Sequence, residues 1–392
     1  MTNINTKNEK KRLVSLFYFN IMFSGKDMFL VPKYLSDYLN FQGEIVYPKS
    51  KENEMFFGEY RGVKLVPIRS LSNYYSTLWS EKEMAWWLIR NAKSIDVLSL
   101  FWLNHRNLIF AKLYKLLNPK GICYIKADLG YTDFSKKSVG LKNSIKVWLH
   151  KSVDILSVET EENYNGIIEG NWGNHLKKAT VLMSNGFDVE LFEETNIVRR
   201  NFSEKENLII TVGRIGHIDK NNEMMLASID GVNIGKWKFM LVGPVEDSFI
   251  AVYESFLLRN PDKRGKVILT GAIFDRKQLW EIYNKAKVFL LTSPKEGMPM
   301  VFSEALAFGN YIISTKVSST KDISANGNLG KIIGIGDVDA LKEALKEVFE
   351  LKVDLENNYK KAISLSESKF NWRNQITIIG DRIKEIGDSK NN

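Results

Sequence analysis

Two carboxylates, Glu296 and Glu304, stand eight positions apart at a predicted junction of strand, loop and helix. The apolar run 287–291 predicts a buried strand and residues 293–298 predict a loop. Pro299 predicts the start of a helix, because a first helical turn tolerates a missing amide. Free amides at a helix start favour phosphate, and carboxylates accept hydrogen bonds from sugar hydroxyls. The spacing therefore predicts a site for a ligand that carries both hydroxyl groups and phosphate.

Cations follow another predicted strand, 208–212. Gly213 and Arg214 come directly after it, and Lys220 lies at the start of the next predicted helix. Gly271 follows a further strand, where a glycine allows the backbone to approach a ligand closely. A lone Arg214 or Lys220 would more often be a solvated surface charge, but the glycine context favours phosphate binding.

Apolar runs of strand length recur along the whole chain with helical patterns between them. The runs are 13–19, 44–47, 63–67, 97–100, 122–125, 155–158 and 181–183, followed by 208–212, 239–242, 267–270, 288–291, 311–314 and 331–333. Continuous apolar strands joined by helices predict parallel sheets that are buried on both faces. We therefore expect an α/β protein with two Rossmann-like, doubly wound parallel-sheet domains that face an inter-domain cleft.

The length of 392 residues also favours two domains, because it exceeds what a single hydrophobic core usually supports. The charged, weakly periodic stretch 190–207 predicts the boundary between them. We expect an N-terminal domain over residues 1–189 and a C-terminal domain over 190–363. The remaining residues, 364–392, have a helical pattern.

The net charge of +9 lies entirely in the first half of the chain. Residues 1–185 contain 26 Lys and Arg against 17 Asp and Glu, and the remainder is balanced. This asymmetry indicates an acidic partner, such as an anionic membrane surface or a phosphorylated acceptor. We expect no nucleic-acid partner, because the chain has no recognisable nucleic-acid-binding motif.

One basic segment leaves two interpretations open. Leu141, Ile145, Trp148 and Leu149 form a helical stripe that is flanked by Lys136, Lys137, Lys142, Lys146 and Lys151. Such a stripe is usually a core-packing helix with solvated edges, and this is the interpretation we favour. The alternative is a helix that faces an anionic membrane.

The sequence gives no pattern for a metal or other cofactor. Cys123 is the only cysteine, which excludes an intramolecular disulfide and fits a reducing compartment. The four histidines lack metal-ligand spacing. Asp337 and Asp339 mimic a metal-binding Asp-x-Asp pair, but Asp337 follows Gly336 and precedes a helical pattern, which predicts a helix cap. We expect no metal and no cofactor.

The second half resembles the GT-B glycosyltransferases of the large, mostly retaining family 4. The matching segments are Gly213-Arg214 with Lys220-Asn221, Gly271, the pair Glu296 and Glu304, and Asn185-Gly-Phe-Asp188. Phe370-Asn371-Trp372 resembles the family's turn into a terminal helix that crosses back to the first domain. The resemblance covers the second domain in order and the first domain only loosely.

The resemblance implies a role for each matching residue. Arg214 and Lys220 would bind the donor diphosphate, and Glu304 would bind the ribose hydroxyls. Glu296, with the backbone of Gly297, Met298 and Pro299, would hold the transferred sugar, while Gly213 and Gly271 shape the donor site. For retaining members the leaving phosphate takes the acceptor's proton, so Glu296, Arg214 and Lys220 are the expected catalytic residues and no protein base is required.

The first domain departs from the family pattern at two places. The expected double glycine is replaced by Ser24-Gly25-Lys26, so we expect Gly25 to keep the donor-loop role and Lys26 either to contact the acceptor or to be a surface charge. A histidine common after a central strand is absent, and Asp128 lies there instead as a candidate acceptor for sugar hydroxyls.

These features predict a hexosyltransferase that uses a nucleotide-sugar donor, which we expect to be a UDP-sugar. Its acceptor would be a glycan or a lipid-linked saccharide in cell-surface polysaccharide or glycoconjugate synthesis. The alternatives are a nucleotide-sugar epimerase, a two-domain sugar receptor, and an inactive or regulatory binding subunit. The apolar run 13–23 is too short to span a bilayer, and we expect a cytoplasmic protein that attaches peripherally to the inner face of the cell membrane.

Overall fold

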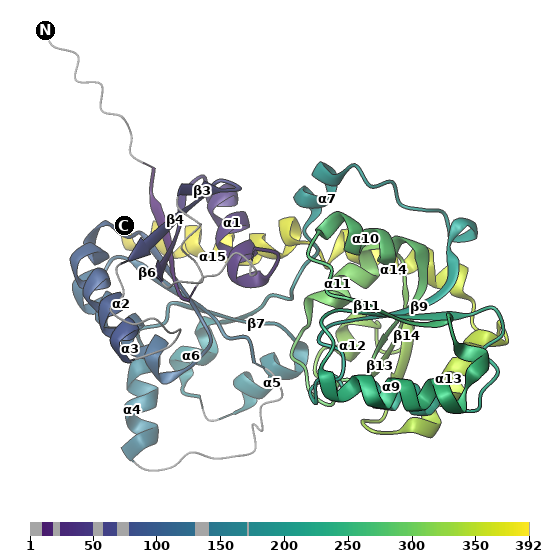
Figure 1. Cartoon of the computed structure of the whole chain (residues 1–392). Coiled ribbons are helices and arrows are strands. Elements are labelled where there is room, and N and C mark those ends of the chain that lie inside the picture. Colours follow the sequence, from purple (N-terminus) through teal and green to yellow (C-terminus); the bar gives the residue numbers. More distant parts are fainter. Residues whose placement is uncertain are drawn as a thin grey trace, which may run out of the picture. The chain divides into compact units, whose positions relative to one another are not determined.

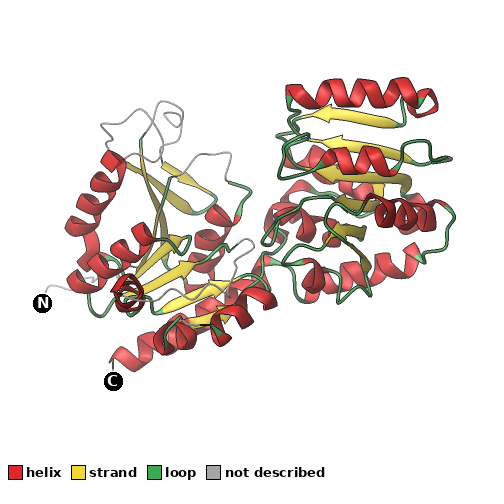
Figure 2. Ribbon diagram, turned by 90° about the horizontal axis from the view of Figure 1, so that it is seen from below, coloured by secondary structure: helices red, strands yellow, loops and turns green. Residues whose placement is uncertain are grey.

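The computed structural model describes residues 10–18, 24–49, 58–68, 78–129, 141–170 and 172–391, shown in Figures 1 and 2. The chain divides into two compact units. Unit 1 comprises Met1–Ser184 and Trp372–Asn392, and unit 2 comprises Asn185–Asn371. The divisions expected from the sequence fall after residues 189 and 363.

Unit 1 is built on an eight-stranded sheet with the order β3-β4-β2-β1-β5-β6-β7-β8. The strands are β1 (Arg12–Leu16), β2 (Gln42–Pro48), β3 (Gly58–Tyr60), β4 (Val63–Ile68), β5 (Val97–Phe101), β6 (Ile122–Lys126), β7 (Ile155–Val158) and β8 (Thr180–Leu182). All neighbours pair in parallel except β3, which is antiparallel to β4 at one edge. The predicted parallel strands of this unit are confirmed.

The helices of unit 1 alternate with its strands. They are α1 (Asp27–Leu39), α2 (Leu78–Asn91), η3 (Ala92–Ser94), α3 (His105–Leu117), α4 (Leu141–His150), α5 (Glu161–Glu169), α6 (Asn174–Ala179) and α15 (Trp372–Asn391). The terminal helix α15 packs on α1 and belongs to this unit although it follows all of unit 2 in the sequence.

Unit 2 has a six-stranded parallel sheet with the order β11-β10-β9-β12-β13-β14. The strands are β9 (Glu206–Val212), β10 (Lys238–Val242), β11 (Val267–Gly271), β12 (Ala286–Leu291), β13 (Tyr311–Thr315) and β14 (Gly330–Ile333). The helices are α7 (Val189–Thr195), η4 (Phe202–Glu204), α8 (Asn222–Ser228), α9 (Asp247–Arg259), η5 (Pro261–Lys263), α10 (Arg276–Lys285), α11 (Met300–Ala307), α12 (Thr320–Ile323), α13 (Val338–Phe349) and α14 (Leu355–Ser368).

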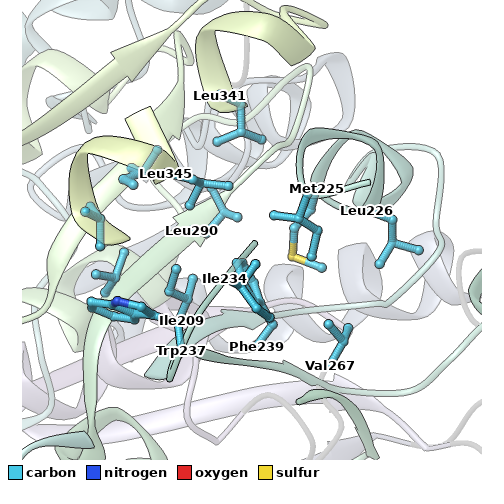
Figure 3. Close-up of a cluster of buried hydrophobic side chains, with 14 of the residues drawn as sticks. Ile209, Met225, Leu226, Ile234, Trp237, Phe239, Val267, Leu290, Leu341 and Leu345 are labelled. Atoms are coloured by element: carbon cyan, nitrogen blue, oxygen red, sulfur yellow. The ribbon is translucent and has the colours of Figure 1, made fainter. Parts of the chain in front are cut away.

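Both faces of the second sheet are buried, as the continuous apolar strands predict. One face packs against α8, α9 and α13 in the core cluster drawn in Figure 3, which includes Ile209, Met225 and Leu345. The other face packs against α10, α11 and α14, with Leu208 and Ile210 on that side. Helices thus cover both faces of the parallel sheet, which is the doubly wound arrangement.

Each sheet has one point where the strand order reverses. On one side of this point successive strands are added toward one edge of the sheet, and on the other side toward the opposite edge. In unit 1 this point lies between β1 and β5, and in unit 2 between β9 and β12. Loops at the carboxyl ends of the strands that flank such a point form the usual ligand site of an open parallel sheet. The loops that follow β9 and β12 contain Gly213, Lys220 and Glu296.

Candidate active site

The predicted cation and carboxylate of unit 2 meet at this reversal point. Lys220, from the loop after β9, forms an ion pair with Oε1 of Glu296, from the loop after β12. The Ser293 hydroxyl donates to the same Oε1 at 2.9 Å, and the Thr292 hydroxyl donates to the backbone oxygen of Lys220 at 2.8 Å. Two loops that are 76 residues apart in the sequence are thus joined through both side chain and backbone.

A row of glycines shapes the backbone beside Lys220. The Gly213 amide donates to Val242 O at 2.9 Å, and the Gly243 amide donates to Gly271 O at 3.0 Å. Gly243 has a φ of 142°, and a Cβ built on it would lie 1.8 Å from the backbone oxygen of Gly213. Only a glycine fits there, so the ends of β9 and β10 approach each other more closely than side chains would allow.

Arg214 lies beside Lys220 but is more exposed. Its guanidinium is 3.4 Å from Asp219 Oδ2, and 53% of its side chain is accessible. A small pocket here is lined by Thr211, Val212, Gly213, Arg214, Ile215, Lys220, Asn222 and Leu291. The structure therefore brings Gly213 and both predicted cations together at this edge of the sheet.

Asn185 anchors the loop between Glu296 and α11 through a hydrogen bond to the backbone of that loop. The Asn185 amide donates to Met298 O at 2.7 Å, and both residues are buried. Gly297 lies between Glu296 and Met298. Helix α11 begins at Met300, one residue later than expected, and Pro299 is its N-cap residue with a φ of −65° and a ψ of 136°. Its side chain cannot supply a cap, so the first amides of α11 face the loop without a side-chain partner from Pro299.

Glu304 is buried and already paired. It forms an ion pair with Arg276 at the start of α10, and the Trp280 indole donates to its Oε1 at 3.3 Å. Burial and then the negative charge of Glu304 raise the pKa of Tyr283 well above its ordinary value. Sequence reasoning missed Arg276 and Trp280, because nothing in their local sequence indicates that α10 delivers them to Glu304.

The corresponding edge of unit 1 contains a buried lysine between two acids. Lys126 ends β6 and is fully buried, with Nζ 3.1 Å from Asp27 Oδ2 and in an ion pair with Glu159 Oε1. Asp27 starts α1 and Glu159 follows β7. Glu159 Oε2 is buried and has no hydrogen-bond partner among the described residues. Since charges without partners are costly to bury, Lys126 is the group that allows both acids to stay there.

Asp128 lies next to this cluster and is exposed. The Trp102 indole, from the loop after β5, donates to Asp128 Oδ2 at 2.8 Å. Both residues have left-handed backbone, with a φ of 43° for Asp128 and 72° for Trp102. Left-handed backbone is unusual for a tryptophan and concentrates at functional sites. The sequence analysis singled out Asp128 but missed Trp102.

Gly25 and Lys26 lie in the turn that precedes α1. The backbone oxygen of Lys26 accepts hydrogen bonds from Phe29 and Leu30, and its side chain is exposed. The turn places them one and two residues before Asp27, at the same carboxyl edge as Lys126.

Among the described residues, one carboxylate cluster has the spacing of a cation site. Asp27, Asp128 and Glu159 each offer an oxygen within 4.8 Å of the others. Lys126 already supplies a positive charge to two of the three. The arrangement is therefore accounted for as an ion-pair cluster. At the other candidate pair, Asp337 caps α13 by accepting from the Ala340 amide at 2.9 Å, which confirms the predicted helix cap.

Two doubly wound units, each with a reversal of strand order in its sheet, define a two-domain α/β protein of the GT-B architecture. Residues 192–365 match the family described as glycosyl transferases group 1. The match lies within unit 2, so the domain that holds Lys220 and Glu296 is the one that the family model covers.

Two curated proteins are similar in sequence. The chain is 27% identical over 261 residues to the capsular polysaccharide biosynthesis glycosyltransferase CapM of Staphylococcus aureus, covering 61% of this chain and 64% of that protein. It is 30% identical over 179 residues to a Campylobacter jejuni α-1,4-N-acetyl-D-galactosaminyltransferase whose name includes a PP-undecaprenol saccharide, covering 43% and 47%. The chain thus spans less than two thirds of the length of either relative.

The solved structures show the fold over nearly the whole chain. HepE of Anabaena, in complex with UDP, superposes with a TM-score of 0.71 at 12% identity and covers 96% of this chain and 100% of that chain. The GT-B fold predicted from the sequence is confirmed. In sequence, the chain is similar to glycosyltransferases over residues 192–365 and over the matched parts of the two curated proteins.

Proposed function

We propose that this chain transfers a sugar from a UDP-sugar to a glycan or lipid-linked acceptor with retention, in the synthesis of a cell-surface polysaccharide or glycoconjugate. The observation that carries this proposal is the joining of Lys220 and Glu296 across the reversal point of unit 2. The loops there offer cations, a carboxylate and close backbone, which are the groups that a diphosphate and a hexose require.

We propose that donor binding breaks the ion pair between Lys220 and Glu296. Lys220 and Glu296 now neutralise each other, with 21% and 17% of their side chains exposed. A donor diphosphate would compete with Glu296 for the ammonium group of Lys220. The carboxylate of Glu296 would then be free to accept hydrogen bonds from hydroxyls of the transferred sugar.

The same groups would assist bond cleavage. Breaking the bond between sugar and phosphate moves negative charge onto the nucleoside diphosphate, and Lys220 and Arg214 would stabilise this charge as it develops. With retention, the leaving phosphate takes the proton of the attacking hydroxyl. This mechanism requires neither a metal nor a protein base, so we expect transfer to persist in EDTA.

The names of the similar proteins support the choice of substrates. HepE was solved with UDP and with UDP-glucose, and the Campylobacter relative is named for a PP-undecaprenol saccharide. In unit 1, Asp128 and Trp102 offer a carboxylate and an aromatic ring side by side, which suits the hydroxyl and apolar faces of a sugar. We assign the acceptor to this pair, and Lys26 to its exposed border.

Calorimetric titration with UDP tests the donor site directly, without knowledge of the acceptor. Wild-type protein is expected to bind UDP, and Lys220→Ala should weaken binding by about tenfold and reduce sugar transfer by about a hundredfold. Glu296→Gln should leave UDP binding nearly unchanged and impair transfer, because its proposed partner is the sugar. Lys238→Ala, an exposed lysine of the same unit, is the control. Failure of the wild type to bind UDP, or unchanged binding by Lys220→Ala, would refute the assignment.

A further inference from the structure

Three neighbouring helices of unit 1 expose large apolar side chains to solvent. Within the described part of the chain these are Trp86 and Ile89 on α2, Ile109 and Leu116 on α3, and Ile145 and Trp148 on α4, with exposures of 55, 43, 56, 66, 50 and 51%. We call this set the α2–α4 face. Isolated exposed apolar residues are common, but a contiguous group marks an interaction surface.

The outward residues of adjacent helices lie side by side. Helix α3 packs against both α2 and α4 (Figure 1). Lys112, which lies between Ile109 and Leu116 on α3, has its ammonium group 4.3 Å from the ring centre of Trp148 on α4. The opposite sides of the helices enter the core through buried residues such as Leu88, Leu108 and Leu149. Of the stripe for which a core-packing helix with solvated edges was favoured, Leu149 is buried, whereas Ile145 and Trp148 are half-exposed, so the core covers only part of it.

Positive charges outnumber negative charges on the three helices, although α2 carries Glu81 and Glu83 beside Lys82 and Arg90, and Glu81 pairs with Arg106. Helices α3 and α4 contain Arg106, Lys112, Lys115, Lys142 and Lys146 and have no Asp or Glu in their sequence. On α2, the guanidinium of Arg90 lies 4.6 Å from the ring centre of Trp86. Each exposed tryptophan thus has a cation over its ring, so apolar and positive groups share one surface.

A helix of unit 2 shows that this combination is not general in the chain. Helix α9 also exposes apolar residues, with Ile250 at 41%, Val252 at 40% and Leu258 at 72%. Its charged residues are Asp247, Glu254 and Arg259, which nearly balance. Both helix sets expose apolar side chains, but the α2–α4 face combines them with an excess of cations and α9 does not.

From this combination we infer that the α2–α4 face docks on an anionic lipid bilayer. Tryptophan is favoured at the boundary between headgroups and acyl chains, and lysine and arginine are attracted to anionic headgroups. Trp86 and Trp148 would insert their rings at this boundary while Arg90 and Lys112 contact lipid phosphates. The inference deepens the proposed function and rests on it in one respect, because a membrane-bound enzyme would meet lipid-linked acceptors at that surface.

Vesicle sedimentation tests the docking surface without donor or acceptor, so it can fail while UDP binding and transfer survive. Vesicles of phosphatidylcholine alone and vesicles with added phosphatidylglycerol are the probes. Wild-type protein is expected to sediment with the second kind and to be released by salt. Arg90→Glu/Lys112→Glu should weaken this binding by about thirtyfold, whereas Lys236→Glu/Lys238→Glu, the same charge change on exposed residues of unit 2, should not.

A second pair of variants separates apolar insertion from charge. Ile109→Ser/Trp148→Ser should weaken vesicle binding by about tenfold, and Ile250→Ser/Leu258→Ser on α9 is the matched control. Unchanged UDP affinity and melting temperature would show that each variant is folded. Absence of wild-type binding to anionic vesicles, equal effects of the α2–α4 and control variants, or a dimer in sedimentation velocity that Ile109→Ser/Trp148→Ser dissociates without any vesicle binding would overturn the inference.

Discussion

The cations at the carboxyl edges of the two sheets differ in their exposure to solvent. In unit 2, Arg214 and Lys220 remain partly accessible beside a row of glycines that narrows the backbone. In unit 1, Lys126 at the end of β6 is fully buried and pairs with Asp27 and Glu159. The cations of unit 2 are therefore accessible to a ligand, whereas the Lys126 ammonium group of unit 1 is enclosed and paired with two carboxylates of the protein itself.

Under the proposed function, this difference suits the two edges to different substrates. Accessible cations and close backbone match a diphosphate, which carries concentrated negative charge. In unit 1, Lys126 offsets only part of the negative charge of its cluster. Under the proposed function, Asp128 and Trp102 at the surface of this cluster supply a saccharide with a hydrogen-bond acceptor and an apolar surface. Substitutions that exchange or remove these properties test the contrast.

Removal of the buried cation should have the largest effect. Lys126→Met leaves Asp27 and Glu159 without their shared partner, and breaking a buried ion pair in this way costs about 3–5 kcal/mol of unfolding free energy. Thermal unfolding measures the loss. Lys126→Met/Glu159→Met should recover part of it, because the buried acid is also removed.

The matched control is Lys331→Met in unit 2. Lys331 pairs with Glu347 at 3.0 Å, but 45% and 42% of the two side chains are exposed. An exposed pair contributes less than about 1 kcal/mol, so this variant should unfold almost as the wild type does. Equal losses for Lys126→Met and Lys331→Met would show that the edge of unit 1 does not depend on its buried charge.

In unit 2 we expect stability and UDP binding to depend on the close approach of two backbone segments rather than on a buried ion pair. Gly243→Ala places a Cβ against the backbone oxygen of Gly213 and should cost roughly 1–3 kcal/mol of stability. Displacement of Gly213 should also weaken UDP binding by about tenfold. Gly235→Ala is the control, because Gly235 also has a positive φ of 54° but would gain a Cβ with nothing within 4 Å. If both variants bind UDP equally well, the close approach of β9 and β10 is not part of the donor site.

A smaller and more selective effect is expected at the proposed acceptor pair. Asp128→Asn keeps the size of the side chain and removes its charge, and Trp102→Phe keeps an aromatic ring but removes the donor to Asp128. Each should raise the KM for the acceptor by about tenfold, with UDP affinity unchanged. Steady-state kinetics with donor and acceptor varied separately measures this. A rise in the KM of the donor instead would assign the pair to the other substrate.

The sequence predicted the sheets well because continuous apolar runs signal buried parallel strands. Every predicted apolar run coincides with a strand of the structure. Of the strands β1 to β14, β3 is the one for which no run was predicted. Its residues, Gly58, Glu59 and Tyr60, form a short edge strand with exposed positions and no apolar run. Its position depends on pairing with β4, which local sequence does not encode.

The candidate site was predictable only where glycine, proline and charge occur together. That pattern singled out Lys220 and Glu296, and the structure joins them. Trp102 and Arg276 carry no comparable local signal. Trp102 takes part through a left-handed backbone, and Arg276 through the packing of α10 against α11, so both depend on tertiary structure.

The smallest predicted difference between the units is their response to acid. His150 ends α4, is 2% exposed, and burial lowers its pKa to about 4. The ring is neutral in the folded state but takes up a proton near pH 6.5 in the unfolded chain, so acid favours unfolding. The stabilisation is complete above pH 6.5 and is lost as the pH falls toward 4, by on the order of 2 kcal/mol. His150→Phe should remove this part of the pH dependence in denaturant unfolding of unit 1, and parallel profiles of the wild type and the variant over this range would contradict the prediction.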